Sequence, residues 1–261
     1  MAKTTWFLGT LLGAALITGC TASPSPRGGS RQGPKTRSVV HRTKSASPKP
    51  KAVSASVKAG ARLFVQFACD KCHGAHGMGG IGNPVLRAAI PPLQHTNFSG
   101  LGGKTAIIGI LQNGIILTNG QNTGVVNMPA WNGILTTKQM GELADYIEAG
   151  TPDLPVKPLP TATGPELYVA YACEKCHGAY GRGGVVNVGS PVGSGHHLVP
   201  TLTADNFAKD PSGYRNALWL GVIIHEGYPE GKIGALLMPA WGQIIPNRQE
   251  TRLLAYLQNG R

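Results

Sequence analysis

Acidic and aromatic residues are scarce in this sequence, and so are long apolar runs. Only 12 of the 261 residues are Asp or Glu, against 24 Lys and Arg, and aromatic residues make up 6%. The single long apolar run excludes a membrane protein with many spans, and 41% hydrophobic residues exclude collagen-like and disordered chains. The length allows one or two domains with a buried core. The formal net charge of +12 would suit nucleic acid or an anionic membrane as a partner.

The surplus of positive charge is confined to one segment near the N-terminus. Residues 21–57 hold eight basic residues and no acidic one, whereas residues 58–261 hold 15 basic and 12 acidic residues. The basic segment is rich in Ser and Pro, which predicts a disordered tether with an r.m.s. span of roughly 30 to 35 Å. Its charges can also lie against anionic lipid. The basicity therefore belongs to this tail, and we expect no nucleic acid as a partner.

The N-terminus carries the signals of export. An apolar run at residues 6–18 is too short to span a bilayer comfortably but suits a secretory signal peptide. The run ends in Leu16-Ile-Thr-Gly-Cys20, which resembles the lipobox of bacterial lipoproteins. That resemblance implies a signal peptide at 1–19 and a lipidated Cys20, which begins the tether at 20–57. An ordinary cleaved signal peptide and an uncleaved transmembrane helix are the alternatives.

The remainder of the chain repeats itself. Residues 61–75 align without a gap on residues 165–179 at an offset of 104. The segment Met128-Pro-Ala-Trp131 aligns on Met238-Pro-Ala-Trp241 at an offset of 110. The repeat predicts two homologous domains, the first half at residues 58–150 and the second half at residues 163–261. A Pro-rich, semi-rigid linker at residues 151–162 is expected between them.

Helical spacing of apolar residues predicts that each half is mainly α. Leu63, Phe64 and Phe67 precede the first cysteine pair, and Leu167, Tyr168 and Tyr171 precede the second. Each half also ends in an expected helix, with a capping box at Thr136 and Gln139 and an N-cap at Asn247 paired with Glu250. Gly, Pro and Asn are frequent between these helices, so we expect loops to dominate the middle of each half.

Two C-x-x-C-H motifs carry the chemistry. They are Cys69-Asp-Lys-Cys72-His73 and Cys173-Glu-Lys-Cys176-His177, the signature of covalent c-type haem attachment. Two thiols one helical turn apart can add to the two vinyl groups of one porphyrin edge, and the next residue offers an imidazole to the iron. A zinc site would have to join the two cysteine pairs, although each half carries its own complete set. A thioredoxin-like redox pair would need a βαβ context, which the sequence does not suggest.

With these motifs the sequence resembles class I cytochromes c, specifically tandem dihaem forms, over residues 58–261. The resemblance implies two covalently attached haem c groups and a methionine as the sixth iron ligand in each half. Met128 lies 55 residues after His73, and Met238 lies 61 residues after His177. The resemblance further implies that Pro92 and Pro200 lie near the iron-binding histidines, His73 and His177. Gly74 and Gly178 are interpreted as allowing the backbone to approach the macrocycle. The expected haem-binding residues are Cys69, Cys72, His73, Met128, Cys173, Cys176, His177 and Met238.

No ligand role is expected for the other histidines, because none has a matched partner in the repeat. They are His41, His76, His95, His196, His197 and His225. Two protein ligands on each iron leave no open position for a substrate, so the resemblance implies an electron-transfer protein without catalytic residues, anchored outside the cytoplasm. Its partners would be redox proteins or a membrane oxidase or dehydrogenase, which it would serve as a free carrier or as a subunit. A dihaem peroxidase, in which one iron opens a position, is the alternative.

Overall fold

The computed structural model describes residues 52–83, 88–93, 98–116, 127–187, 198–202, 217–227 and 238–259. All of these belong to one compact unit that spans residues 50–261. The expected signal peptide, Cys20 and nearly all of the basic tail lie outside the described residues, as do His41, His95, His196 and His197. Within the described part of the chain no helix is both long enough and apolar enough to cross a bilayer.

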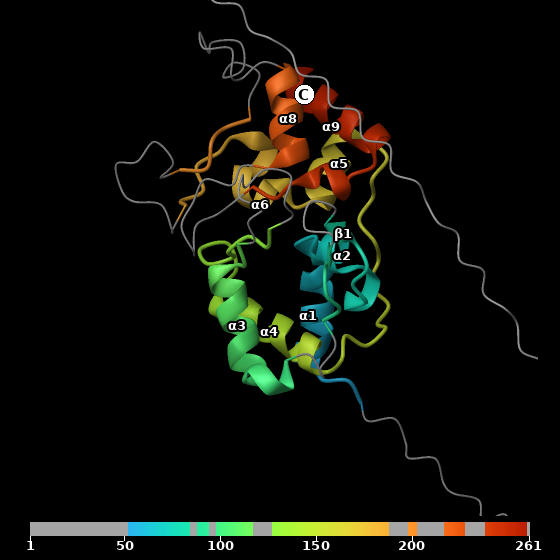
Figure 1. The fold of residues 1–261 in the computed structure, drawn as a ribbon, viewed down its shortest axis with the longest axis vertical. Helices are drawn as coiled ribbons and strands as arrows, with labels where there is room; N and C mark the ends of the chain where they lie inside the picture. Colours follow the sequence, from blue (N-terminus) through green and yellow to red (C-terminus); the bar gives the residue numbers. More distant parts are fainter. Residues whose placement is uncertain are drawn as a thin grey trace, which may run out of the picture. The chain divides into compact units, whose positions relative to one another are not determined.

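The first half is built on two helices that pack against each other, α1 (Ala55–Gln66) and α4 (Thr137–Glu148) (Figure 1). Helix α1 begins after Ser54, whose side chain accepts a hydrogen bond from the amide of Val57. Helix α4 begins with the predicted capping box, in which the side chains of Thr136 and Gln139 bond each other's backbone amides. The prediction that this half opens and closes with a helix is therefore confirmed.

The corresponding pair in the second half is α5 (Gly164–Ala170) and α9 (Asn247–Asn259), which also pack together. A capping box that the sequence reading missed, Thr163 with Glu166, opens α5. The predicted N-cap at Asn247 is wrong, because Asn247 is already the first residue of α9. The Pro246 carbonyl accepts the amides of Gln249 and Glu250 instead. Proline suits this helix start because its carbonyl can accept these bonds and it has no amide hydrogen that would need a partner.

The middle of each half contains a helix that the sequence reading did not predict. They are α3 (Gly103–Asn113), which packs on α4, and α8 (Ala217–Glu226), which packs on α9. Glycines inside and beside these segments lowered their apparent helical propensity, but buried Ile107 and Leu111 fix α3 through tertiary contacts. The other elements are short: an antiparallel pair, β1 (Gly82–Asn83) with β2 (Ala88–Ala89), and the 3-10 turns η1 (Ala75–Gly77), η3 (Ser99–Leu101), η4 (Ala179–Gly181) and η5 (Trp241–Gln243).

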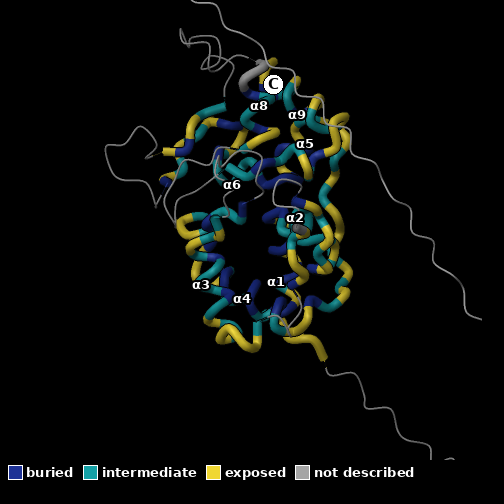
Figure 2. Tube along the Cα trace, in the orientation of Figure 1, coloured by how far each residue is buried: buried dark blue, intermediate teal, exposed yellow. Residues whose placement is uncertain are grey.

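Each half buries its own cluster of apolar side chains. The first cluster joins Phe64 and Leu63 of α1 to Leu143 and Tyr146 of α4, and Ile107 of α3 completes it. The second joins α5, α8 and α9 through Leu167, Tyr168, Leu220, Ile224, Leu253 and Leu257. Figure 2 shows buried residues along the sides on which α1 and α4 meet. The aromatic residues are few, but Phe64 with Tyr146 and Tyr168 with Tyr256 lie where these helices meet.

A glycine marks the close crossing of the first and last helices in both halves. A Cβ atom added to Gly60 would overlap the backbone carbonyl of Glu142 and the Cβ of Tyr146. At the repeat-equivalent Gly164 it would overlap the Cβ of Tyr256. Phe64 packs on Tyr146 and Tyr168 packs on Tyr256, with ring centroids 5.5 and 5.9 Å apart. Each crossing thus combines a backbone contact that only glycine permits with an aromatic pair beside it.

Gly60→Ala tests the first crossing. The added methyl group must push α1 away from the α4 backbone, so we expect the free energy of unfolding to fall by about 1 to 3 kcal/mol. Chemical denaturation of the full-length protein measures the change. Gly141→Ala on α4 is the matched control, because no atom lies within 4 Å of its added Cβ. The control should be neutral or stabilising by up to about 1 kcal/mol, and equal effects of the two variants would contradict the close crossing.

Asp145 on α4 joins that helix to α1 and α3. Its carboxylate accepts hydrogen bonds from the Ser56 hydroxyl on α1 and from the Lys104 ammonium on α3. Desolvation opposes its ionisation, but the bonds from Lys104 and Ser56 outweigh that effect, and the pKa of Asp145 is lowered. The folded carboxylate therefore binds a proton less readily than the same group in the unfolded chain.

Asp145→Asn should destabilise the protein at neutral pH and make less difference in acid. The contribution of Asp145 to the free energy of unfolding is complete above the pKa of the group in the unfolded chain, near 3.9. This contribution is lost as the pH falls through the lower pKa of the folded state. Denaturation midpoints of the wild type and the variant should therefore differ at pH 7 and converge on acidification. Asp153→Asn, at a side chain that is 89% exposed, should change the stability by less than about 0.5 kcal/mol at pH 7. A difference between wild type and Asp145→Asn that grows in acid would contradict this account.

Candidate functional site

Both C-x-x-C-H motifs form a single helical turn, α2 (Cys69–His73) and α6 (Cys173–His177). The residue before each turn is an alanine in the left-handed region, Ala68 with φ 56° and Ala172 with φ 55°. This backbone kink separates each turn from the preceding helix, so the two cysteines start a new helical face. Residues three apart lie on the same side of a helix. The predicted placement of both thiols beside one porphyrin edge is compatible with this local geometry.

A glycine ends each turn because the chain folds back sharply after the histidine. Gly74 and Gly178 both have φ 74°. The amide of Gly79 donates to the His73 carbonyl at 2.6 Å, and the amide of Gly183 donates to the His177 carbonyl at 2.7 Å. A Cβ on Gly74 would lie 2.7 Å from the carbonyl oxygen of Gly79. The structure thus gives these glycines a role in the fold-back, and the interpretation that they let the backbone approach the macrocycle stays a prediction.

The imidazole of His177 is held in the tautomer that a metal ligand needs. Its Nδ1 donates a hydrogen bond to the Pro200 carbonyl at 3.0 Å, so Nε2 keeps its lone pair. Burial lowers the pKa of His177, and the Pro200 carbonyl opposes that shift only in part. The ring is therefore neutral at neutral pH. The expectation that Pro200 lies beside the proximal histidine is confirmed.

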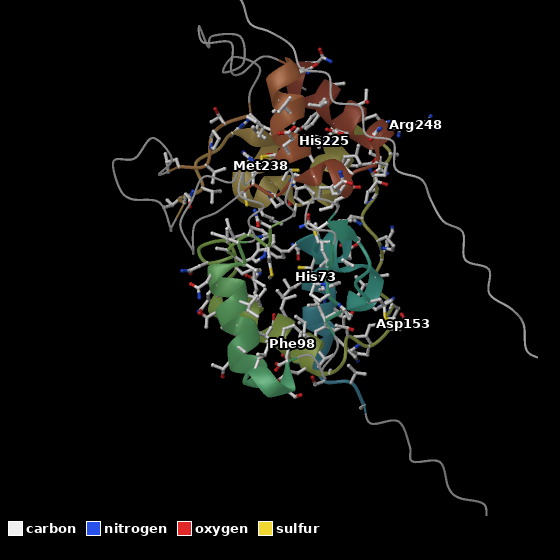
Figure 3. The ribbon with its side chains drawn as sticks, in the orientation of Figure 1. His73, Phe98, Asp153, His225, Met238 and Arg248 are labelled. Atoms are coloured by element: carbon white, nitrogen blue, oxygen red, sulfur yellow. The ribbon has the colours of Figure 1, made fainter. Side chains whose placement is uncertain are left out.

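The first half also places its histidine near a proline, with two differences from the second half. Burial also lowers the pKa of His73, and the backbone of Pro91 is the group that opposes this shift. The expected neighbour was Pro92, one residue later. Leu93 and Leu202 are the equivalent residues of the two loops, because their amides donate to the carbonyls of Gly77 and Gly181, each at 2.7 Å. Pro91, two residues before Leu93, therefore corresponds to Pro200. The His73 Nδ1 is buried and has no hydrogen-bond partner among the described residues. Figure 3 shows His73 on the side of α2 that faces α3.

All four cysteines of the motifs are free thiols. Burial, assisted by neighbouring negative charge, raises the pKa of Cys69 and Cys72, the latter to about 12. Burial likewise raises the pKa of Cys173 to about 12 and of Cys176 to about 11. Such thiols stay protonated, unlike the activated thiolate of a redox pair. Within the described ranges no group of three or more His, Cys, Asp or Glu side chains is placed to hold a metal ion.

The predicted methionine ligands lie in segments that pack on the same clusters as the cysteines. Met128 and Trp131 contact the first cluster together with Cys69, and Met238 and Trp241 contact the second together with Cys173. Met128 is held by a backbone pair with Ile115, in which the two amide-to-carbonyl distances are 2.9 and 3.1 Å. Figure 3 labels Met238 in the second half. The structure thus brings each Met-Pro-Ala-Trp segment to the core that carries a C-x-x-C-H turn.

The tryptophan of each segment has a role that the sequence reading missed. Trp131 packs edge-to-face on Phe67, with ring centroids 5.8 Å apart, and Trp241 packs on Tyr171 at 5.7 Å. Phe67 and Tyr171 lie two residues before the first cysteine of each motif. Each tryptophan therefore fixes the methionine segment to the start of the C-x-x-C-H turn. The repeat could have indicated this role, since Trp131 and Trp241 occupy equivalent positions in it.

These residues fit a covalently bound c-type haem in each half. The thiols are neutral and unbridged, and the His177 ring has its Nε2 free, which is the donor set that such a group requires. Cys69 and Cys72, or Cys173 and Cys176, would hold the porphyrin by thioether bonds. The histidines would hold the iron, and Met128 and Met238 remain predicted as the opposite ligands. When bound, a haem supplies one-electron iron redox chemistry.

The two remaining histidines in the described part of the chain lie on the surface. His76 is half-exposed, and its Nε2 lies 3.3 Å from the Asp153 carboxylate. His225 is half-exposed as well, and its Nδ1 lies 3.6 Å from Glu250. Both have acidic partners and are partly exposed, and the absence of a ligand role for them stays a prediction.

Comparison with known proteins relates the first half to a described family. Residues 55–147 match the family described as cytochrome c oxidase, cbb3-type, subunit III. Over 218 residues the chain is 29% identical to the cbb3-type cytochrome c oxidase subunit CcoP of Azospirillum brasilense. That alignment covers 81% of this chain and 64% of the relative, so the chain spans less than two thirds of the relative's length. No solved structure gave a significant match. The segment from residue 55 to residue 147 is thus similar to the subunit III domain of cbb3-type cytochrome c oxidases.

Proposed function

We propose that the protein is a dihaem electron-transfer cytochrome. His73 with Met128 and His177 with Met238 would be the axial pairs of two covalently held haems. The observation that carries the proposal is the doubled arrangement of a C-x-x-C-H turn, a proline beside its imidazole, and a Met-Pro-Ala-Trp segment packed on the aromatic residue before the turn. A relative that aligns far beyond the first domain supports a cytochrome function for both halves.

The chain's own residues set the conditions for electron transfer. Neutral, buried imidazoles would provide nitrogen ligands, and the thioethers of Met128 and Met238 would raise the reduction potential relative to a second histidine. The apolar clusters and the Trp contacts surround the segments that carry these residues. If a histidine and a methionine both hold each iron, the site would exchange electrons and would not bind a substrate.

We further propose that the protein serves a membrane oxidase as its electron-entry cytochrome. The matched family and the matched relative are both named as parts of cbb3-type oxidases. They do not favour the peroxidase alternative, and no feature of the described residues does. The lipidated Cys20 and the basic tether of residues 20–57 would keep the haem domains at the outer side of a bacterial membrane, within reach of that complex.

Methionine ligation is tested by Met128→Leu and Met238→Leu, one at a time. Each substitution should abolish the near-infrared ligand band of one ferric haem and lower that haem's reduction potential. The shift should be on the order of 0.1 V, within the range of about 0.8 V over which axial ligands act. Absorption spectroscopy and redox titration of the full-length protein measure both effects, and the haem content by pyridine haemochrome should remain two per chain.

Two other methionines serve as controls. Met140→Leu replaces a buried core side chain and Met78→Leu an exposed one, so both should keep two ligand bands and both potentials. Met140→Leu should cost less than about 1.5 kcal/mol of stability. A single haem per chain would contradict the dihaem proposal. Two haems with both ligand bands intact in Met128→Leu and Met238→Leu would contradict the ligand assignment alone.

Membrane tethering is tested by Cys20→Ser. We expect the wild type to incorporate labelled fatty acid and to sediment with membranes, because two or more acyl chains suffice for stable anchoring. The variant should lose the label and appear in the soluble extracytoplasmic fraction with both haems in place. Label that survives Cys20→Ser would contradict lipidation at this residue.

Association with an oxidase is tested by mild detergent extraction and native electrophoresis with haem staining. The haem stain should migrate with a large complex that has oxidase activity, because the relative is named as an oxidase subunit. Migration only as a free 27.2 kDa chain would support a free carrier instead.

A further inference from the structure

Two lysines inside the haem-attachment motifs contact aromatic rings of the opposite half. The ammonium of Lys71 lies 6.0 Å from the ring centroid of Tyr171, and that of Lys175 lies 5.2 Å from the ring centroid of Phe67. These distances are within the range of cation–π attraction. The motif of each half therefore touches the segment that leads into the motif of the other.

The two contacts are reciprocal. Lys71 and Lys175 are equivalent at the repeat offset of 104, and so are Phe67 and Tyr171. Lys71 of the first half thus contacts Tyr171 of the second, while the equivalent Lys175 of the second half contacts Phe67 of the first. This is the pattern of a two-fold, self-complementary interface, here made within a single chain. One accidental lysine contact would not generate its own symmetry mate.

Burial and charge indicate that these lysines are part of a built contact. Their side chains are only 21% and 20% exposed, whereas lysine is rarely buried without a partner. Each forms an ion pair inside its own motif, Lys71 with Asp70 at 2.8 Å and Lys175 with Glu174 at 2.7 Å. The interface therefore brings together two positive and two negative groups and carries no net charge. Partial desolvation strengthens a cation–π contact over its value in water.

The ring under each lysine also belongs to the methionine side of a site. Phe67 packs on Trp131 and Tyr171 packs on Trp241, and these tryptophans end the two Met-Pro-Ala-Trp segments. The Tyr171 hydroxyl donates to Gln249 of α9 at 2.7 Å, which fixes the ring further. Movement of one half against the other would thus disturb residues that lie beside both haem sites.

The linker is held at both ends, which favours such docking. Leu154 and Val156 pack against the first cluster. At the other end the Ala162 carbonyl accepts a hydrogen bond from Arg252 of α9 at 2.9 Å. A short linker with little freedom gives the two surfaces a high effective concentration for each other, so weak individual contacts suffice.

We propose that Lys71 and Lys175 are positioning residues that dock the two halves in one pseudo-two-fold arrangement, each half being the partner of the other. The proposal deepens the proposed function, because it assigns the surface that would keep the two haem sites in a fixed relation. It does not depend on which redox protein delivers or receives the electron.

The test uses the full-length protein with both haems, as Lys71→Gln, Lys175→Gln and the double variant. Hydrogen exchange of residues 67–73 and 171–177 reports opening of the interface, and small-angle scattering reports the radius of gyration. Each single variant should raise exchange in both segments about fivefold, and the double variant about tenfold or more. The double variant should also have the larger radius of gyration. Lys71→Arg with Lys175→Arg should restore protection, because the guanidinium keeps a cation over each ring.

Lys138→Gln is the matched control, since this lysine is 85% exposed and pairs only weakly, at 3.9 Å, with Glu142. It should leave exchange and radius unchanged. Unchanged exchange and radius in the double variant, with two haems bound, would overturn the docking proposal but leave the proposed function intact. If the glutamine variants fail to mature, hydrogen exchange of the wild type tests the proposal instead. Residues 67–73 and 171–177 should then open with the same equilibrium constant, and different constants for the two segments would overturn the proposal.

Discussion

The close crossing of the first and last helices is the constraint on which each half depends. Gly60 and Gly164 remove the one atom that would hold the helices apart, and an aromatic pair, Phe64 with Tyr146 or Tyr168 with Tyr256, fills the space beside the crossing. The C-x-x-C-H turn follows the first helix directly, so this crossing sets where the turn begins. In the first half, Asp145 adds polar bonds from α4 to α1 and α3.

The site is assembled by short-range restraints on both sides of the turn. A left-handed alanine starts it, a left-handed glycine ends it, and the chain then returns a proline-containing loop to the histidine. On the other side the tryptophan of the Met-Pro-Ala-Trp segment packs on the aromatic residue before the turn. Because these restraints recur in both halves, the same local chemistry is offered twice. The reciprocal lysine contacts then relate the two sites through residues that already shape each of them.

Much of this could be read from the sequence, because covalent chemistry has strict spacing. The C-x-x-C-H motifs, the repeat and the capping box at Thr136 needed no tertiary information. The middle helices α3 and α8 could not be predicted, because their glycines weaken local propensity and packing alone decides them. The proline beside His73 was assigned one residue too late, since the alignment of a loop gives no register until the Leu93 and Leu202 amides fix it.

The candidate donor atoms and the location of the charge follow from the order of the residues: two sets of thiols and imidazoles with predicted thioether ligands, in a nearly neutral body behind a basic tail. Which groups orient these candidates is visible only in the folded chain. The tautomer of His177 depends on a carbonyl 23 residues away, and the partners of Lys71 and Lys175 lie in opposite halves of the chain. Spacing along a chain specifies local bonds, whereas hydrogen bonds and ring contacts between distant segments exist only after the helices have packed.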